Sequence, residues 1–251
     1  MSSTVYLITG ANRGIGLAVA AQLAARPNAI VFAGARDPTR AKELNALADA
    51  HPGRLHVIKV VSADRANNDA AAEEIKKVAG RLDVVIANAG ISDSFLDALE
   101  VTPEEMTRHF EINTNGPLVL FQATHALLSA SPAPKFVPIS SGNGSIEQGT
   151  QFPGDIYPYG ASKAALNWVV RKLHREFPAM IIFPLAPGAV ETDLTMSAAK
   201  RDPGIGELIK DFPLITTEES ARGIVEQVDV ATRETHGGQF VDITGLGKWA
   251  W

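Results

Sequence analysis

The sequence of 251 residues contains no cysteine. Disulfide bonds, thiolate nucleophiles and cysteine-based zinc sites are therefore excluded. A basic excess is also missing, because the net charge is −5, so no global positive field attracts nucleic acid or anionic lipid. No apolar run is long enough to span a membrane, and residues 1–16 lack the pattern of a signal peptide. We expect a cytoplasmic protein without nucleic-acid or membrane partners.

Metal-binding patterns are missing as well. The six histidines are scattered along the chain, and none forms a His-Glu-x-x-His motif or a close pair. We therefore expect them on the surface or in packing contacts, and we predict no metal site. What the chain does have is 45% hydrophobic residues, which is enough for a sizeable core.

Short, β-rich apolar runs alternate with amphipathic stretches along the chain. Seven runs are typical of strands: 4–10, 29–35, 55–61, 82–90, 135–140, 180–188 and 238–244. Helical patterns follow most of them, at 15–26, 39–50, 66–79, 103–130, 159–177 and 217–230. Continuous apolar strands followed by helices indicate a parallel sheet covered on both faces. The sequence predicts an α/β protein in which residues 1–251 form one doubly wound Rossmann-fold domain with a seven-stranded parallel sheet.

Two stretches, 142–158 and 189–216, show no regular pattern. Both follow predicted strands, at the edge where open α/β sheets bind their ligands. They could be ordinary surface loops, but loops at that edge often carry function. We expect them to face the substrate.

The segment TGANRGIG follows the first predicted strand and opens a helix. Gly10 suits a tight turn, Gly14 lets the backbone approach a pyrophosphate, and Gly16 permits close packing of helix on strand. The helix N-terminus adds free N–H groups and the positive end of the helix dipole. A nucleotide-binding P-loop is excluded, since no Gly-Lys-Ser/Thr follows. The segment predicts a dinucleotide site.

The second strand ends in Arg36, and Asp37 follows it. An acidic residue at this position hydrogen-bonds an adenosine ribose and favours NAD, whereas arginine pairs with the 2′-phosphate of NADP. Arg13 lies inside the glycine segment and adds a second positive charge. We predict NADP(H) as the cofactor. The alternative is that both arginines are solvated and that Asp37 binds the ribose.

Tyr159 and Lys163 are four residues apart and therefore share one face of a helix. Tyr157 has no cation one turn away, and Pro158 disfavours helical conformation at that tyrosine. Carbonyl reduction needs a proton donor, and a free tyrosine, with a pKa near 10, is too weak an acid near neutrality. An ammonium about 4 Å away at an effective dielectric near 20 contributes roughly 4 kcal/mol, or about three pKa units. We expect Lys163 to lower the pKa of Tyr159.

These motifs, in this order, resemble the short-chain dehydrogenase/reductase family: Gly-x-x-x-Gly-x-Gly, ANAG at 87–90, PISSGNG at 138–144, Tyr-x-x-x-Lys and PGAVET at 187–192. The resemblance implies that Ser141 positions the substrate carbonyl, with Ser140 as the less favoured choice. It also implies that Asn113 holds a water in a proton relay to Lys163, and that Lys163 binds the nicotinamide ribose.

The same resemblance implies a set of cofactor contacts. They comprise Gly10, Asn12, Arg13, Gly14, Ile15, Gly16, Arg36, Asn88, Ala89, Gly90, Tyr159, Lys163, Pro187, Gly188, Val190 and Thr192. Asn88 is expected mainly to stabilise the sheet, and the segment from Pro187 to Thr192 to hold the carboxamide. Val61 stands where the family usually has an acid at the adenine edge. Asp64 is either its substitute or the cap of the next helix.

The stretches LVLFQATHALL, YGASKAALNWVVRKLHREF and PGAVETD are similar to the fungal norsolorinic acid ketoreductase-like group. This implies a ketoreductase for a bulky or aromatic ketone that forms a homodimer or homotetramer. Seventeen residues separate Ser141 from Tyr159, a longer loop than the family leads us to expect, and Phe152 and Tyr157 within it are predicted substrate contacts. The C-terminal GKWAW is expected to pack against a partner subunit or the substrate cleft. An NAD-dependent alcohol dehydrogenase and a non-catalytic dinucleotide-binding regulatory protein are the alternatives.

Overall fold

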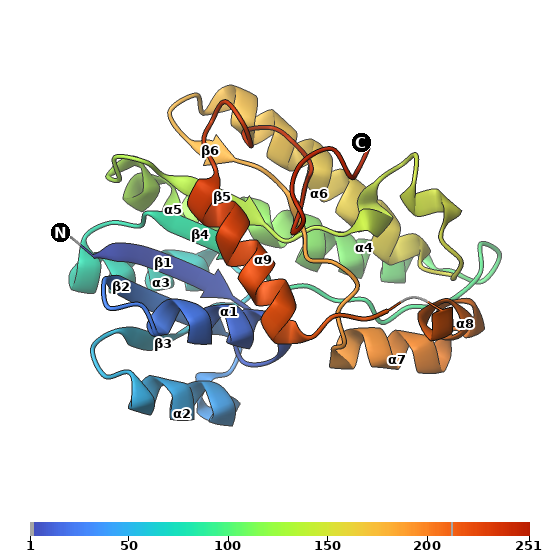
Figure 1. The fold of residues 1–251 in the computed structure, drawn as a ribbon, viewed down its shortest axis with the longest axis horizontal. Coiled ribbons are helices and arrows are strands. Elements are labelled where there is room, and N and C mark those ends of the chain that lie inside the picture. Colours follow the sequence, from blue (N-terminus) through green and yellow to red (C-terminus); the bar gives the residue numbers. More distant parts are fainter. Residues whose placement is uncertain (1–2, 212) are drawn as a thin grey trace.

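Six parallel strands form the main sheet of the computed structural model, which describes residues 3–211 and 213–251 (Figure 1). The strands are β1 (Thr4–Thr9), β2 (Ala29–Ala35), β3 (Leu55–Lys59), β4 (Val84–Ala87), β5 (Lys135–Pro138) and β6 (Ile181–Ile182). Their order is β3-β2-β1-β4-β5-β6. The direction of winding reverses between β1 and β4, so a crevice for a ligand is expected at their carboxyl ends.

Two short strands form a second parallel pair, β7 (Leu185–Ala186) with β8 (Val241–Asp242). The predicted fold class is confirmed, but the prediction of seven strands in one sheet is wrong in detail. The predicted strand 180–188 is divided into β6 and β7, and Pro184 between them has no N–H to donate to a strand ladder. A single parallel bridge from Ile139 to Leu185 keeps β7 beside the end of β5.

Helices cover both faces of the main sheet, as predicted (Figure 1). One face packs against α1 (Gly14–Ala24), α2 (Lys42–Ala50) and α9 (Thr217–Val230), and the other against α3 (Arg65–Ala79), α5 (Gly116–Ser129) and α6 (Tyr157–Glu176). Side chains alternate along β1: Tyr6 joins one hydrophobic cluster, whereas Leu7 joins the other. The sheet is therefore held by two cores, one on each side.

The predicted irregular stretch 189–216 contains two helices, α7 (Asp193–Arg201) and α8 (Pro203–Asp211), and residue 212 in it lies outside the described residues. Thr192 caps α7 by accepting a hydrogen bond from the Thr195 N–H. Gly204 and Gly206 lower the helix propensity of α8, so the sequence pattern does not predict a helix there. Both helices lie at the end of the sheet toward which the strands point (Figure 1).

The predicted helix 103–130 is interrupted by a π-helical segment. It consists of α4 (Pro103–Phe110), a π-helix from Glu111 to Asn115, and α5. Single π-helical turns inside α-helices occur mostly at functional sites. Asn113, a predicted catalytic residue, lies in the middle of this segment.

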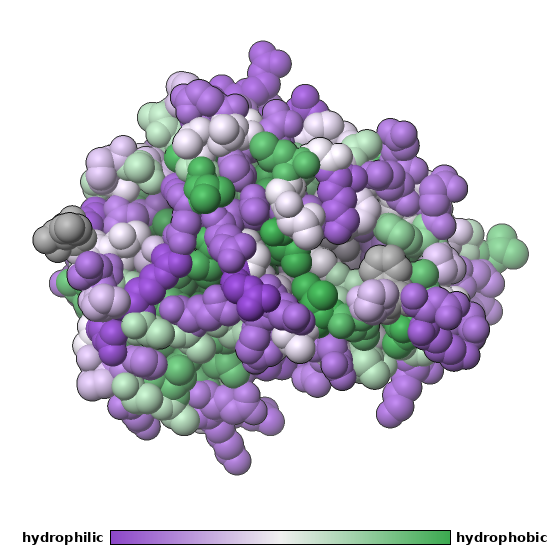
Figure 2. Space-filling model, in the orientation of Figure 1, coloured by the Kyte–Doolittle hydropathy of each residue, from purple (hydrophilic) through white to green (hydrophobic). Residues whose placement is uncertain are grey.

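The surface is mainly hydrophilic on the face drawn in Figure 2, where hydrophobic side chains form small and separate patches. In residues 3–211 and 213–251, none of the helices combines the length and the apolar character needed to cross a bilayer.

Candidate active site

The glycine segment forms a tight turn between β1 and α1. Gly10 and Gly14 have φ angles of 64° and 55°, in the left-handed region that favours glycine. A Cβ atom on Gly16 would lie 2.4 Å from the Gly10 carbonyl oxygen and 2.6 Å from Asn88 Nδ2. Asn88 Nδ2 in turn donates to the carbonyl oxygens of Thr9 and Gly10, at 3.0 and 3.3 Å. Asn88 therefore joins the end of β4 to the glycine turn.

The N-terminus of α1 suits a phosphate. Its N-cap residue, Arg13, makes no side-chain capping bond within the described chain, so the first N–H groups of the helix are available to a ligand. Asn12 and Arg13 are exposed, whereas Ile15 is half-buried. Close packing at Gly16, free N–H groups and the positive end of the helix dipole together fit a dinucleotide pyrophosphate.

Arg36 and Asp37, the two candidate contacts of the adenosine ribose or its 2′-phosphate, differ in what they already bind. Asp37 Oδ1 accepts hydrogen bonds from the N–H and the hydroxyl of Thr39, at 3.1 and 2.6 Å, and caps the short 3-10 helix that follows. Arg36 is exposed and forms no ion pair within residues 3–211 and 213–251. Arg13 Nη1 lies 3.1 Å from Asp193 Oδ2 in an exposed ion pair, which the sequence did not predict. An exposed pair of this kind is weak and can be exchanged for a phosphate contact.

Asp64 caps α3, accepting a hydrogen bond of 3.0 Å from the Asn67 N–H. Of the two roles proposed from the sequence, the structure shows the cap. Val61 N–H donates to Asn67 Oδ1 at 2.6 Å, so the end of β3 is held by the same turn.

Tyr159 lies in the first turn of α6, as predicted, although the helix begins two residues earlier than the predicted 159–177. Helix boundaries of this kind shift easily, and Pro158 is tolerated at the second position because its missing N–H has no intrahelical partner there. Tyr157 is the first residue of α6 and is 49% exposed. Tyr159, two residues later and on the opposite side of the helix, is half-buried and lies beside Ser141.

The side chains of Ser141 and Tyr159 are neighbours, since the Ser141 hydroxyl is close enough to lower the pKa of Tyr159. Ser141 Oγ also accepts from the Asn143 N–H at 3.2 Å, which fixes the turn after β5. Ser140 is buried and its Oγ donates to Asn167 Oδ1 at 2.6 Å. This contact occupies Ser140 and leaves Ser141 as the serine beside the tyrosine.

Lys163 is buried one turn after Tyr159. Its Nζ donates to the Ile139 carbonyl oxygen at 2.8 Å and lies 5.7 Å from the centroid of the Tyr159 ring. Burial lowers the pKa of Lys163 to about 8. Burial also raises the pKa of Tyr159, and the Ser141 hydroxyl offsets only part of that rise. The pKa of Tyr159 is therefore raised in the cofactor-free structure and not lowered as expected, because desolvation is the largest cause and Lys163 Nζ is directed at the Ile139 carbonyl oxygen.

Asn113 is fully buried. Its Oδ1 accepts from the Ile91 N–H at 2.9 Å, and its Nδ2 donates to the Ile91 carbonyl oxygen and to Ser162 Oγ, at 2.9 and 3.0 Å. Both amide hydrogens are thus used, so the side chain fixes the loop after β4 against α6. A Cβ on Gly90 would lie 3.1 Å from Asn113 Oδ1 and 3.5 Å from Lys163 Nζ, which places Gly90 between them.

The segment after β7 returns to the glycine turn. Gly188 has a φ of 84°, and Val190 is buried and bridged to Ile215. The Pro187 carbonyl oxygen accepts a hydrogen bond from Ser220 Oγ at 2.7 Å. Thr192 Cγ2 would be 3.8 Å from a Cβ on Gly14. Thr192 therefore lies beside the glycine turn, although the two are far apart in the sequence.

The two predicted substrate loops contact each other. Asp202, which precedes α8, is buried, and its Oδ2 accepts a hydrogen bond of 2.6 Å from the Asp155 N–H. A Cβ on Gly154 would lie 2.7 Å from Ile205 Cγ1, so this glycine permits close contact with α8. Phe152 is half-buried and its ring centroid is 6.2 Å from that of Trp249.

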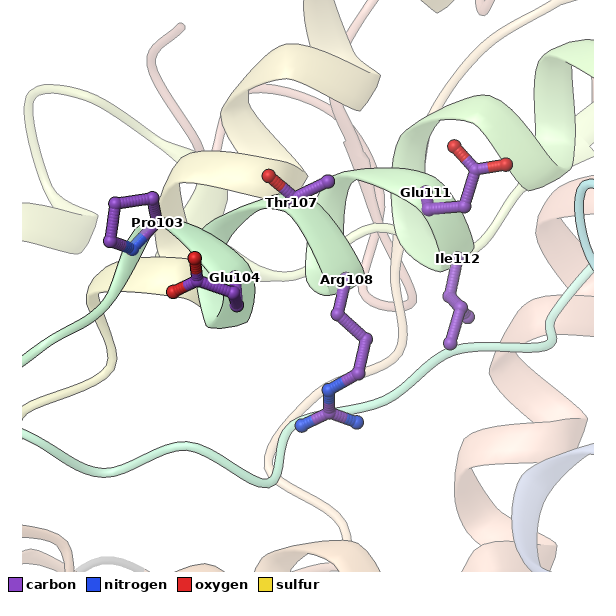
Figure 3. A pocket seen from close by; sticks show the side chains of 6 residues that line it. All are labelled: Pro103, Glu104, Thr107, Arg108, Glu111 and Ile112. Carbon is purple, nitrogen blue, oxygen red and sulfur yellow. The ribbon is translucent and has the colours of Figure 1, made fainter.

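A separate pocket of about 430 Å³ lies along α4 and the π-helix (Figure 3). Its lining residues are Pro103, Glu104, Thr107, Arg108, Glu111 and Ile112. They all come from one continuous stretch of chain, whereas a ligand site encloses its ligand between several elements. No predicted site residue lines this pocket.

The low pKa of Lys163 makes stability depend on pH. An unfolded lysine titrates near 10.4 and the buried one at about 8, so between these values the unfolded chain binds more protons and stability rises with pH. We expect the cofactor-free wild type to gain roughly 3 kcal/mol relative to Lys163→Met from pH 7.5 to 10.5. Urea unfolding at several pH values measures this, with Lys172→Met, an exposed change in α6, as the control. Parallel pH profiles for wild type and Lys163→Met would contradict the burial of a charged group.

Comparisons with known proteins agree with this geometry. Residues 4–203 match the short chain dehydrogenase family. The chain is 35% identical to the short-chain dehydrogenase RED3 of Pyricularia oryzae over 95% of both chains. It is 33% identical to the norsolorinic acid ketoreductase of Aspergillus parasiticus over 99% of this chain and 91% of that one. The crystal structure of an NADPH-bound carbonyl reductase from chicken fatty liver superposes with a TM-score of 0.86 at 30% identity, covering 99% and 100% of the two chains.

The matched region contains the glycine turn, the Ser141–Tyr159 pair, Lys163, Asn113 and the segment from Pro187 to Thr192. On the strength of this match, the predicted resemblance is confirmed: the chain is an oxidoreductase that belongs to the short-chain dehydrogenase family, whose members bind a nicotinamide dinucleotide.

Proposed function

We propose that this chain is an NADPH-dependent ketoreductase that reduces a bulky or aromatic ketone, with Tyr159 as the general acid. The observation that carries the proposal is the placement of Tyr159 beside both Ser141 and the buried Lys163, whose Nζ lies 5.7 Å from the centroid of the Tyr159 ring. Two similar proteins are named as a norsolorinic acid ketoreductase and as an NADPH-bound carbonyl reductase, and these names support the reaction type and the cofactor.

The glycine turn, Gly90 and the segment from Pro187 to Thr192 would hold NADPH, which supplies the hydride when bound. Ser141 and Tyr159 would both donate hydrogen bonds to the carbonyl oxygen of the ketone and so fix its orientation. As negative charge develops on that oxygen, Tyr159 transfers its hydroxyl proton to it. The raised pKa of Tyr159 keeps this proton in place at neutral pH before the reaction.

Lys163 would stabilise the tyrosinate that proton transfer leaves behind. Its Nζ is fixed by the Ile139 carbonyl oxygen, and with a pKa of about 8 it carries its charge near neutrality. Inside a desolvated site this charge acts over a few ångströms more strongly than in water. Asn113 would act as a positioning residue, since its amide fixes the chain at Ile91 and at Ser162 beside the lysine.

NADPH consumption with activated aryl ketones and aryl diketones tests the reaction. We expect turnover with NADPH, and slower turnover with NADH at equal concentrations. Efficient turnover with NADH alone would favour an NAD-dependent alcohol dehydrogenase. Tight NADPH binding without reduction of any compound in a broad carbonyl panel would favour a non-catalytic dinucleotide-binding protein.

Arg36 is expected to determine the preference for NADPH. It is exposed at the end of β2, and Asp37 beside it is already engaged by Thr39. Because a charged hydrogen bond to the 2′-phosphate contributes about 1.5–3 kcal/mol, Arg36→Ala should reduce the NADPH-to-NADH ratio of kcat/KM roughly 10- to 100-fold. Arg40→Ala, also exposed, serves as the control. An unchanged ratio in Arg36→Ala would remove this arginine from cofactor recognition.

A cytoplasmic homodimer or homotetramer completes the proposal. An exposed aromatic residue on the outer face of α6 supports it, since Trp168 is 68% exposed and aromatic residues are enriched in subunit interfaces. Sedimentation velocity at micromolar concentration tests it, and a monomer at all concentrations would overturn it.

A further inference from the structure

The C-terminal segment returns to the site and places an indole ring on the turn that carries Ser141. A Cβ on Gly142 would lie 2.4 Å from Trp249 Cη2 and 2.6 Å from its Cζ2. The benzo edge of Trp249 therefore lies in direct contact with the backbone of Gly142. The neighbouring residue, Ser141, lies beside Tyr159.

A buried carboxylate fixes Trp249 in this place. Asp242, at the end of β8, is fully buried, and its Oδ2 accepts a hydrogen bond of 2.9 Å from Trp249 Nε1. Its Oδ1 accepts from Thr244 Oγ1 at 2.7 Å and from Lys248 Nζ at 3.1 Å. Burial raises the pKa of Asp242, but these hydrogen bonds outweigh it and hold the pKa below its usual value. The indole is thus attached to the sheet and not to a free chain end.

A second contact holds the same segment to the loop between Ser141 and α6. Gln148 Nε2 donates to the Lys248 carbonyl oxygen at 3.2 Å, and Gln148 Oε1 accepts from the Ala250 N–H at 2.8 Å. These two bonds flank Trp249 on either side in the chain. The ring of Phe152 approaches Trp249 edge-on, with an interplanar angle of 72°.

We propose that Trp249 forms one wall of the substrate pocket and selects ketones that carry an aromatic ring. This inference rests on the proposed ketoreductase function and names the substrate class of that site. Trp249 is half-buried, so part of its ring is accessible to a ligand beside Ser141. Together with Phe152, Trp249 would place two aromatic rings near Ser141. An aryl group bonded to the carbonyl carbon would contact these rings, whereas a small alkyl group would not.

The contrast between an aryl and an alkyl diketone tests this role. The two probes are 1-phenyl-1,2-propanedione and 2,3-butanedione, assayed with saturating NADPH. We expect Trp249→Ala to lower kcat/KM for the phenyl compound roughly tenfold or more and to change kcat/KM for butanedione less than about threefold. Trp251→Ala is the matched control, because Trp251 stacks on Phe240 and against Arg171 and should leave both values unchanged.

A double-mutant cycle tests the contact itself. Gly142→Ala inserts a methyl group where the indole lies, so it should displace Trp249 and reproduce the selective loss for the phenyl compound. In the Trp249→Ala background the same methyl group meets empty space, so its further effect should be less than about twofold.

Four results would overturn the inference. Equal losses for both diketones in Trp249→Ala would show a merely structural role. Unchanged kinetics with both compounds would show that the ring does not face the substrate. Additive effects of Gly142→Ala and Trp249→Ala would show that the contact carries no selectivity. A wild type that reduces neither diketone, nor any other carbonyl compound, would overturn the proposed function, and the inference with it.

Discussion

Tyr159→Phe should lower kcat for ketone reduction by roughly a thousandfold, because it removes the hydroxyl proton that the proposed reaction transfers to the carbonyl oxygen. The ring remains, so the packing of the first turn of α6 is preserved. The dissociation constant for NADPH should change less than about threefold, since the glycine turn is untouched. Steady-state kinetics with an aryl diketone measure kcat, and fluorescence titration measures cofactor binding.

Tyr157→Phe is the matched control for this substitution. Tyr157 is two residues away on the same helix, but it is half exposed, whereas Ser141 and Lys163 lie beside Tyr159. We expect Tyr157→Phe to keep kcat within about threefold and to alter mainly KM for the ketone. Near-wild-type kcat in Tyr159→Phe, or a loss of equal size in both variants, would remove Tyr159 from the role of general acid.

Gly16→Ala should weaken NADPH binding roughly 100-fold or more, which corresponds to about 2.7 kcal/mol. The added Cβ would lie 2.4 Å from the Gly10 carbonyl oxygen and 2.6 Å from Asn88 Nδ2. Two backbone segments would have to separate, and such overpacking also destabilises a fold by about 1–3 kcal/mol. Isothermal titration with NADPH and urea unfolding of the free protein measure the two effects.

Gly14→Ala is the matched control, because it changes the backbone preference in the same turn without introducing a steric clash. A Cβ on Gly14 meets only Thr192 Cγ2, at 3.8 Å, so the change carries the cost of a positive φ, about 1 kcal/mol, without a clash. We expect a loss of affinity at least about fivefold smaller than in Gly16→Ala. Wild-type NADPH affinity in Gly16→Ala would show that the glycine turn is not the pyrophosphate site.

The sequence is sufficient to predict those parts of the fold that depend on local pattern. Continuous apolar strands with helices between them predict the parallel sheet, and the glycine segment marks the turn before α1. The sequence does not predict the number of strands correctly. The strands β6, β7 and β8 have only two residues each, and the break at Pro184 divides one apolar run into two strands. The sequence does not predict α8 for a related reason. Glycines and a proline weaken its local pattern, whereas Asp202 stabilises it by accepting from the Ile205 N–H at its start and from the distant Asp155 N–H.

In the candidate site, too, the sequence predicts the features that depend on local spacing but not those that depend on the fold. Spacing along one helix places Tyr159 near Lys163, but only the fold shows that Lys163 Nζ is directed at the Ile139 carbonyl oxygen and that burial raises the pKa of Tyr159. Contacts between distant segments have no signal in a single sequence. The pairing of Arg13 with Asp193 and the contact of Trp249 with Gly142 belong to this class.

Transfer of a deuteride tests the proposed reaction most directly. NADPH that carries deuterium at both C4 positions is incubated with the protein and an aryl diketone, and the alcohol is examined by mass spectrometry and NMR. We predict one deuterium on the carbinol carbon for each NADPH oxidised, and no labelled alcohol above the uncatalysed level with Tyr159→Phe in the same time. Bound NADPH that transfers no label to any ketone in a broad panel would contradict the assignment of this site as a ketoreductase.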